Sequence, residues 1–140
     1  MKIMGLDYGA KTVGVAVSDE LLLMAHPVET IKRENENKLR KTLARIEALI
    51  KEHDVGKIVL GLPLMLDDSV GERAQKTIEF KEKLEKRTGL PVVFVDERFT
   101  TGASEEELDQ MDVPRNRQKE VIDQLAACHI LDDYLHNAEK

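Results

Sequence analysis

The sequence contains very little cysteine and no long hydrophobic run. One of its 140 residues is cysteine, Cys128, so no disulfide can form within the chain, and a reducing compartment suits the unpaired thiol. The apolar N-terminus gives way to Gly5 and Asp7 too early for a signal peptide, and no stretch approaches membrane-spanning length. We therefore expect a cytoplasmic protein that does not enter a membrane.

Linkers, repeats and an excess of positive charge are also absent. No segment is rich in Pro, Gly or Ser and no unit repeats, so residues 1–140 are predicted to form a single domain. The 41% hydrophobic and 34% charged residues are typical of an ordinary globular chain. A net charge of −6 disfavours indiscriminate binding to polyanions, but a local basic surface can still bind nucleic acid.

The hydrophobic pattern predicts strands and helices in a definite order. Residues 12–18 alternate valines with Gly14 and Ala16, which gives a strand with one face that another element can approach closely. Three antiparallel strands followed by strand–helix alternation predict an α/β fold with a five-stranded mixed sheet flanked by helices. The predicted elements are strands at 2–7, 12–18 and about 27–32, with Pro27 at the start of an edge strand, a helix at 36–53, a strand at 57–61, a helix from about 70 to 88 that ends at Gly89, a strand at 91–95 and a helix from about 114 to 135.

Acidic residues follow two of the predicted parallel strands. Asp7 closes the first strand, and Asp96 and Glu97 follow the strand at 91–95. A single acid after a strand is commonly a turn or cap residue, but two at the carboxyl ends of parallel strands lie where such sheets place their sites. Because adjacent strand residues face opposite ways, Asp96 and Glu97 cannot both point into one site.

A third acid, Asp123, lies on the apolar stripe of the last helix. Its neighbours on that stripe include Ala126 and Ala127, whose small side chains let the helix come close to the sheet. A carboxylate turned toward the sheet is costly unless it is paired, hydrogen-bonded or bound to metal. A salt bridge, to Arg98 or Lys11 for instance, explains Asp123 as well as a metal does.

Three oxygen-donor acids without clustered His or Cys suit Mg²⁺ or Mn²⁺, which prefer carboxylate and water ligands. The histidines are scattered and lack the spacing of a zinc site. They are His26, His53, His129 and His136. Phosphodiester hydrolysis is the reaction that most needs such an acidic cluster, which can hold two ions about 4 Å apart.

Basic and hydroxyl side chains that could bind a phosphate backbone lie close to these acids in the sequence. A run of charge on a helix usually marks a solvated face, but this one opens the helix that carries Asp123. The candidate substrate contacts are Lys11, Arg98, Thr100 and Thr101 and, at the start of the last helix, Arg115, Arg117 and Lys119. A phosphate-binding P-loop at residues 5–12 is excluded, because its second glycine comes one place early and Asp7 would repel phosphate.

Four blocks of sequence together resemble one known family. They read GLDYGAKTVGVAVSD at 5–19, IVLGLPLMLDDSVGERA at 58–74, LPVVFVDERFTT at 90–101 and VIDQLAACHIL at 121–131. In this order they resemble the YqgF family, also called RuvX, whose members are named as pre-16S rRNA nucleases or Holliday junction resolvases. The resemblance covers nearly the whole chain, and the DER-TT and VD-AA patterns are highly specific.

The resemblance implies a ribonuclease H-like fold and a metal-dependent nuclease site. The family acids fall on Asp7, Glu97 and Asp123, which would hold Mg²⁺ or Mn²⁺, and Arg98 with the adjacent threonines adjoins the site. The implied role is maturation of the 5′ end of 16S rRNA, a step in ribosome biogenesis. The partner would then be a ribosomal RNA precursor.

The resemblance leaves some positions open. Met65 and Asp68 stand where the family has Asn and Gly, which affects a substrate-contacting loop more than the metal cluster. Many relatives of this fold have four acids, and Asp96, Asp19 or a water molecule could supply the fourth ligand. Monomer and homodimer, and endonuclease and exonuclease, are equally compatible with the sequence.

Three other functions fit parts of this sequence beside cleavage of ribosomal RNA. The same chemistry could act on branched DNA, where two strands are cut symmetrically and a dimer is required. A non-catalytic nucleic-acid-binding assembly factor would keep the fold, but retention of all three acids disfavours it. An actin-like ATPase combines two copies of this fold, and 140 residues hold one.

Overall fold

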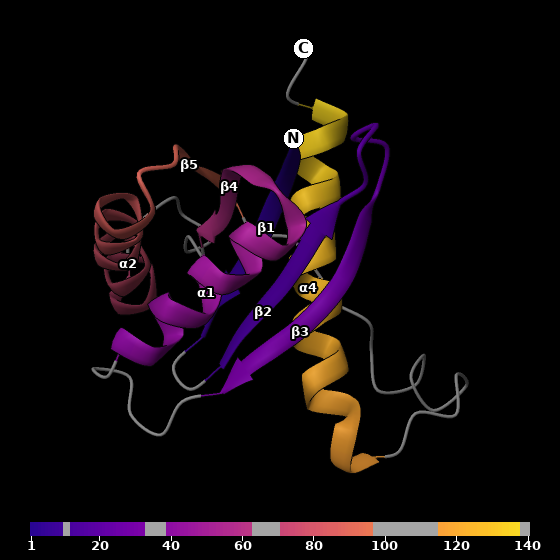
Figure 1. The fold of residues 1–140 in the computed structure, drawn as a ribbon. Helices are drawn as coiled ribbons and strands as arrows, with labels where there is room; N and C mark the ends of the chain where they lie inside the picture. The colour runs from indigo at the N-terminus through magenta and orange to yellow at the C-terminus, as the bar shows by residue number, and fades with distance from the viewer. Residues whose placement is uncertain (10–11, 33–38, 63–70, 97–114, 138–140) are drawn as a thin grey trace.

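A computed structural model describes residues 1–9, 12–32, 39–62, 71–96 and 115–137 of the chain. These residues form one five-stranded sheet with helices α1 and α2 on one face and α4 crossing the other (Figure 1). None of the helices in these ranges is both long and apolar enough to cross a lipid bilayer. The elements are β1 (Lys2–Tyr8), β2 (Thr12–Ser18), β3 (Ala25–Lys32), α1 (Arg40–His53), β4 (Val55–Leu62), α2 (Glu72–Thr88), β5 (Val92–Asp96) and α4 (Arg115–Asn137).

The sheet is mixed, as the sequence predicts. Its strand order is β3-β2-β1-β4-β5, in which β1, β2 and β3 pair antiparallel and β1, β4 and β5 pair parallel. The carboxyl ends of the three parallel strands therefore meet at one end of the sheet. Thr12 and Lys32, a cross-strand pair of β2 and β3, lie at this same end. We call it the Asp7 end, after the acid near the end of β1.

The two faces of the sheet differ in the size of their side chains. Large apolar residues of β1, β2 and β4 pack with α1 and α2 around the buried ring of Phe80. The opposite face is lined by small residues, and α4 lies directly on it. A Cβ atom on Gly5 would lie 2.7 Å from the Cβ of Leu131 and 2.9 Å from the Ala127 carbonyl oxygen. The close approach predicted for the small-residue face is thus confirmed.

Most predicted element boundaries agree with the structure, but β3 and β4 each begin about two residues earlier than predicted, β4 at Val55 rather than at residue 57. α2 ends at Gly89, whose φ of 71° is the left-handed conformation that glycine adopts readily. β3 begins at Ala25 rather than at Pro27, because its pairing with β2 continues through Val17–His26 to Ser18–Ala25, and the Ala25 N–H also donates to Asp132 Oδ1 at 2.7 Å. Pro27 lies inside this outermost strand, where a residue without a backbone N–H donor is tolerated. The first part of the predicted helix at 36–53 falls outside the described residues, and α1 is described from Arg40.

The bond from Ala25 to Asp132 ties the start of β3 to α4, and its loss should be measurable. Asp132→Ala leaves a part-buried N–H without its acceptor, which costs about 2 kcal/mol for a bond to a charged group. We expect the urea unfolding midpoint to fall accordingly. Asp133→Ala, which removes the same charge from the exposed neighbouring side chain, serves as the control. Equal midpoints for the two variants would show that the bond contributes nothing.

Candidate active site

Asp7 lies on the face of the sheet that α4 covers. Ile3 and Gly5, which precede it in β1 at two-residue intervals, both face α4. Side chains along a strand alternate between faces, so Asp7 shares the face of these two residues. Its side chain is partly buried. The cross-strand partner of Asp7 is Gly14 of β2, and directly opposite residues of an antiparallel pair share one face.

Asp123 of α4 rests directly on Gly14. A Cβ atom at Gly14 would overlap the Asp123 carbonyl oxygen and lie 2.5 Å from its carbonyl carbon, so only glycine fits at this position. Because Gly14 is also the partner of Asp7, this contact brings two acids from opposite ends of the chain onto one patch. The patch lies at the Asp7 end of the sheet, where the two predictions from the sequence meet.

The carboxylate of Asp123 contains a buried atom that is not hydrogen-bonded. Within the described ranges its Oδ2 has no hydrogen-bond partner, and no cation there pairs with this side chain. Lys11 and Arg98, the salt-bridge partners considered from the sequence, lie outside the described residues. A buried carboxylate oxygen without a partner is costly unless a cation compensates it. Two neighbouring carboxylates with an unsatisfied oxygen are a donor set that fits a hard divalent cation.

The third acid of the predicted cluster, Glu97, lies outside the described residues. Among the residues that are described, no three His, Cys, Asp or Glu side chains are grouped so that they could hold a metal. The strand before Glu97 is described: Val93 and Val95 pack on the α4 face, and Phe94 packs on the other. Arg115 opens α4, but its side chain is not among those described. The remaining predicted contacts and loop departures outside the described residues are Lys11, Arg98, Thr100, Thr101, Met65 and Asp68.

Asp19, one candidate for a fourth acid, is in the wrong place. It follows the last residue of β2, so it lies five residues beyond Gly14 and roughly 17 Å away at the rise of a strand. The Leu23 N–H donates to its carboxylate at 2.9 Å and lowers the pKa of Asp19 below its ordinary value. Asp19 therefore organises the β2–β3 turn and is not part of the site.

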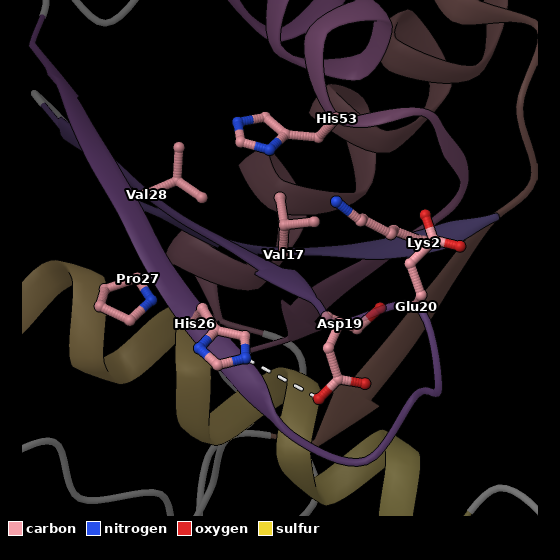
Figure 2. A pocket seen from close by; sticks show the side chains of 9 residues that line it. Lys2, Val17, Asp19, Glu20, His26, Pro27, Val28 and His53 are labelled. Atoms are coloured by element: carbon pink, nitrogen blue, oxygen red, sulfur yellow. Dashed lines mark ion pairs between the residues drawn. The ribbon is translucent and has the colours of Figure 1, made fainter.

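The hollow beside Asp19 is also remote from the two acids. It has a volume of about 390 Å³ and lies between the start of β1, the β2–β3 turn and the end of α1 (Figure 2). In Figure 2 the Asp19 carboxylate points toward His26, with Oδ2 and Nε2 3.8 Å apart. Lys2 and Glu20 also line it, so its charges are mixed and open to solvent. We do not assign this hollow to the site.

Three side-chain contacts near the acids are not predicted by the sequence. Gln124, the residue after Asp123, donates from Nε2 to Thr30 Oγ1 at 3.3 Å and so links α4 to β3. At the end of β1 the ring of Tyr8 stacks on Phe80 with centroids 4.1 Å apart, and the Arg73 guanidinium lies 5.0 Å above Tyr8. The stack fixes the residue next to Asp7. Arg73 lies in the second of the four resembling blocks, at 58–74, but no pattern in the sequence paired it with Tyr8.

Cys128 lies little more than one helical turn after Asp123, but its thiol is inert. Burial raises the pKa of Cys128 to about 11, and the nearby charge of Asp132 adds to the effect. The thiol is therefore protonated at neutral pH, and a protonated thiol is neither a nucleophile nor a metal ligand. The chemistry of this patch belongs to its carboxylates.

Comparison with known proteins gives a family and close relatives. Residues 1–137 match the family model described as "RuvX: Holliday junction resolvase". A protein of Lachnospira eligens is 53% identical over 140 residues, which are all of both chains. One of Agathobacter rectalis is 50% identical over 135 residues, 96% of this chain and 94% of its own. Both carry the name "Putative pre-16S rRNA nuclease".

Solved structures share the fold at much lower sequence identity. RuvC of T. thermophilus in complex with a Holliday junction substrate superposes with a TM-score of 0.56 at 16% identity, over 99% of this chain and 96% of that chain. The fowlpox virus Holliday junction resolvase gives 0.55 at 15% identity, over 99% of both chains. These likenesses confirm the predicted ribonuclease H-like fold.

Proposed function

Because this chain belongs to the RuvX family, we propose that it is a metal-dependent nuclease that hydrolyses phosphodiester bonds of pre-16S rRNA. Relatives that are 53% and 50% identical to this chain, aligned over 100% and 94% of their own length, carry the name "Putative pre-16S rRNA nuclease". The observation that carries the proposal is the buried, unpartnered Oδ2 of Asp123 beside the Asp7–Gly14 pair. With pre-16S rRNA as the substrate, we also propose a cytoplasmic location and a role in ribosome biogenesis.

We assign the metal ligands to Asp7, Glu97 and Asp123. Val93 and Val95 face α4, and alternate residues of a strand share a face. Glu97 is the next residue in this alternation, which favours it over Asp96 as the third ligand. Mg²⁺ or Mn²⁺ is the expected cation, and two ions suit a phosphodiesterase. When bound, the metal polarises the phosphodiester and activates water for attack.

The chain's own contribution is to hold the carboxylates together before substrate arrives. Ladder hydrogen bonds fix Asp7 against Gly14, and the missing side chain at Gly14 lets α4 bring Asp123 onto the same face. Two neighbouring like charges repel, and a bound cation would relieve this repulsion. Partial burial strengthens their attraction for that cation relative to bulk water.

Substrate contacts are proposed on the basic and hydroxyl residues around these acids. Lysine and arginine bind phosphate oxygens, and hydroxyl groups add hydrogen bonds that position the backbone. Such contacts would favour nucleic acid despite a net charge of −6. The residues are Lys11, Arg98, Thr100, Thr101 and Arg115.

Branched DNA is the second candidate substrate, favoured by the description of the family model and by the fold shared with a junction-bound RuvC. A junction is cut on two strands, so this function requires two sites and therefore a homodimer. The molecular mass in solution, measured by light scattering, bears on this choice. A strictly monomeric protein that leaves four-way junctions intact excludes the second candidate.

Cleavage assays on both substrates test the proposal. A 16S precursor RNA and a four-way DNA junction are incubated in parallel with the protein in Mg²⁺, Mn²⁺ or a chelator. We expect cleavage of the RNA that requires the metal and disappears in Asp7→Asn, with the circular dichroism spectrum unchanged. Cleavage by Asp7→Asn at the full wild-type rate would refute the metal role of this residue.

A further inference from the structure

One row of residues runs from Asp7 across the sheet to its outermost strand. Asp7 of β1 pairs with Gly14 of β2, and Gly14 pairs in turn with Thr30 of β3. Gln124 of α4 donates to Thr30 Oγ1, so Thr30 lies on the same face as the two acids. The acid patch therefore continues sideways into a polar surface on β3.

Lys32 extends this polar surface to the Asp7 end of the sheet. It lies two residues after Thr30 and pairs with Thr12. The neighbouring residues of β3 face α1 and α2 instead: Ile31 packs in the core that these helices form, and Glu29 binds Arg45 of α1. Lys32 therefore belongs to the face of Thr30, and its side chain is exposed.

The spacing of the sheet sets the distance from Lys32 to the acids. Two strand separations and two residues of rise place its Cα about 12 Å from that of Asp7. A lysine side chain is long and flexible, so its ammonium group spans much of this distance. A phosphate next to the one held at the acids comes within its reach. β3 is the outermost strand of the described sheet, so a nucleic acid strand bound at the acids can pass β3 and leave the protein at this edge (Figure 1).

We propose that Lys32, with Thr30 beside it, binds a backbone phosphate that flanks the scissile phosphate. The substrate strand then runs from the acids along the Asp7 end of the sheet, past Thr12 of β2, to Lys32 of β3. This proposal rests on the proposed function, because it places the scissile phosphate at the acids. The contact is to the phosphate backbone, so it recognises a nucleic acid strand without reading its sequence.

A binding measurement separates this proposal from the cleavage reaction. Fluorescence anisotropy of a labelled 16S precursor fragment is recorded in an Asp7→Asn background, which is not expected to cut. We expect Lys32→Gln to weaken binding about fivefold, the upper range for an exposed charge pair. The slope of log affinity against log salt should fall in magnitude by about one, the value for one lost phosphate contact. Lys32→Arg should restore most of both.

Lys51→Gln is the matched control. Lys51 is an exposed lysine in the last turn of α1, on the other face of the sheet, and its loss changes the net charge equally. If Lys32→Gln and Lys51→Gln bind with the same affinity and salt slope, the proposal is overturned. Failure of the wild type to cleave any nucleic acid would instead refute the proposed nuclease, and the anisotropy difference would still report whether Lys32 contacts the strand.

Discussion

Asp123→Asn should remove cleavage without destabilising the metal-free protein. Among the described residues, the buried Oδ2 of Asp123 has no hydrogen-bond partner, so the metal-free fold loses no hydrogen bond when this oxygen is replaced. An uncharged amide of the same shape costs less to bury, and the free energy of unfolding in a chelator should stay equal or rise. The cleavage rate should fall on the order of a thousandfold, or about 4 kcal/mol, for loss of a metal ligand.

Initial cleavage rates and urea unfolding measure these two effects on the same preparations. Asp133→Asn is the control, since it neutralises an exposed acid of the same helix. A variant that is clearly less stable than the wild type would show that Asp123 has a structural partner. A rate within tenfold of the wild type would show that the residue is no ligand.

Gly14→Ala should damage both the fold and the site. The added methyl group would overlap the backbone of Asp123, which cannot yield without moving α4. We expect a loss of about 3 kcal/mol in the free energy of unfolding, at the high end for overpacking. Because α4 carries Asp123, cleavage should also fall steeply in any protein that still folds. Thermal unfolding and cleavage rates at a temperature where the variant is folded measure the two losses.

Gly56→Ala controls for the substitution itself. A Cβ there also meets a close neighbour, but the neighbour is the sulfur atom of Met1, whose flexible side chain is 79% exposed and can move. We expect little change in stability for this variant. Equal losses for the two variants would show that the contact between Gly14 and Asp123 has no special role.

Much of the fold could be predicted because each element has a clear hydrophobic period. The alternating valines of β2 and the apolar runs of β4 and β5 specify strands, and their order implies a mixed sheet. The two described acids were also found, Asp7 from the strand end and Asp123 from the helical stripe. Both signals are local, and a local signal can be read from one sequence.

Which residues surround the acids depends on the register in which the strands pair, and no local sequence pattern predicts that register. The register of β2 and β3 shifts between Val15 and Ala16, and such a shift decides which face the residues of β3 occupy. Thr30 and Lys32 were therefore not recognised as neighbours of the acids. Asp19 follows a simpler rule: because β1 and β2 pair antiparallel, the end of β2 lies at the far end of the sheet from Asp7.

The position of the metal can be tested directly by letting the ion cut the chain around it. Fe²⁺ substituted for Mg²⁺ and supplied with ascorbate and peroxide generates hydroxyl radicals, which cleave the backbone close to the bound ion. Cuts should cluster around Asp7, Gly14 and Asp123, which adjoin one another in the fold, and disappear in Asp7→Asn. Cuts that persist in Asp7→Asn, or that gather around Asp19 and His26, would contradict a metal site at this patch.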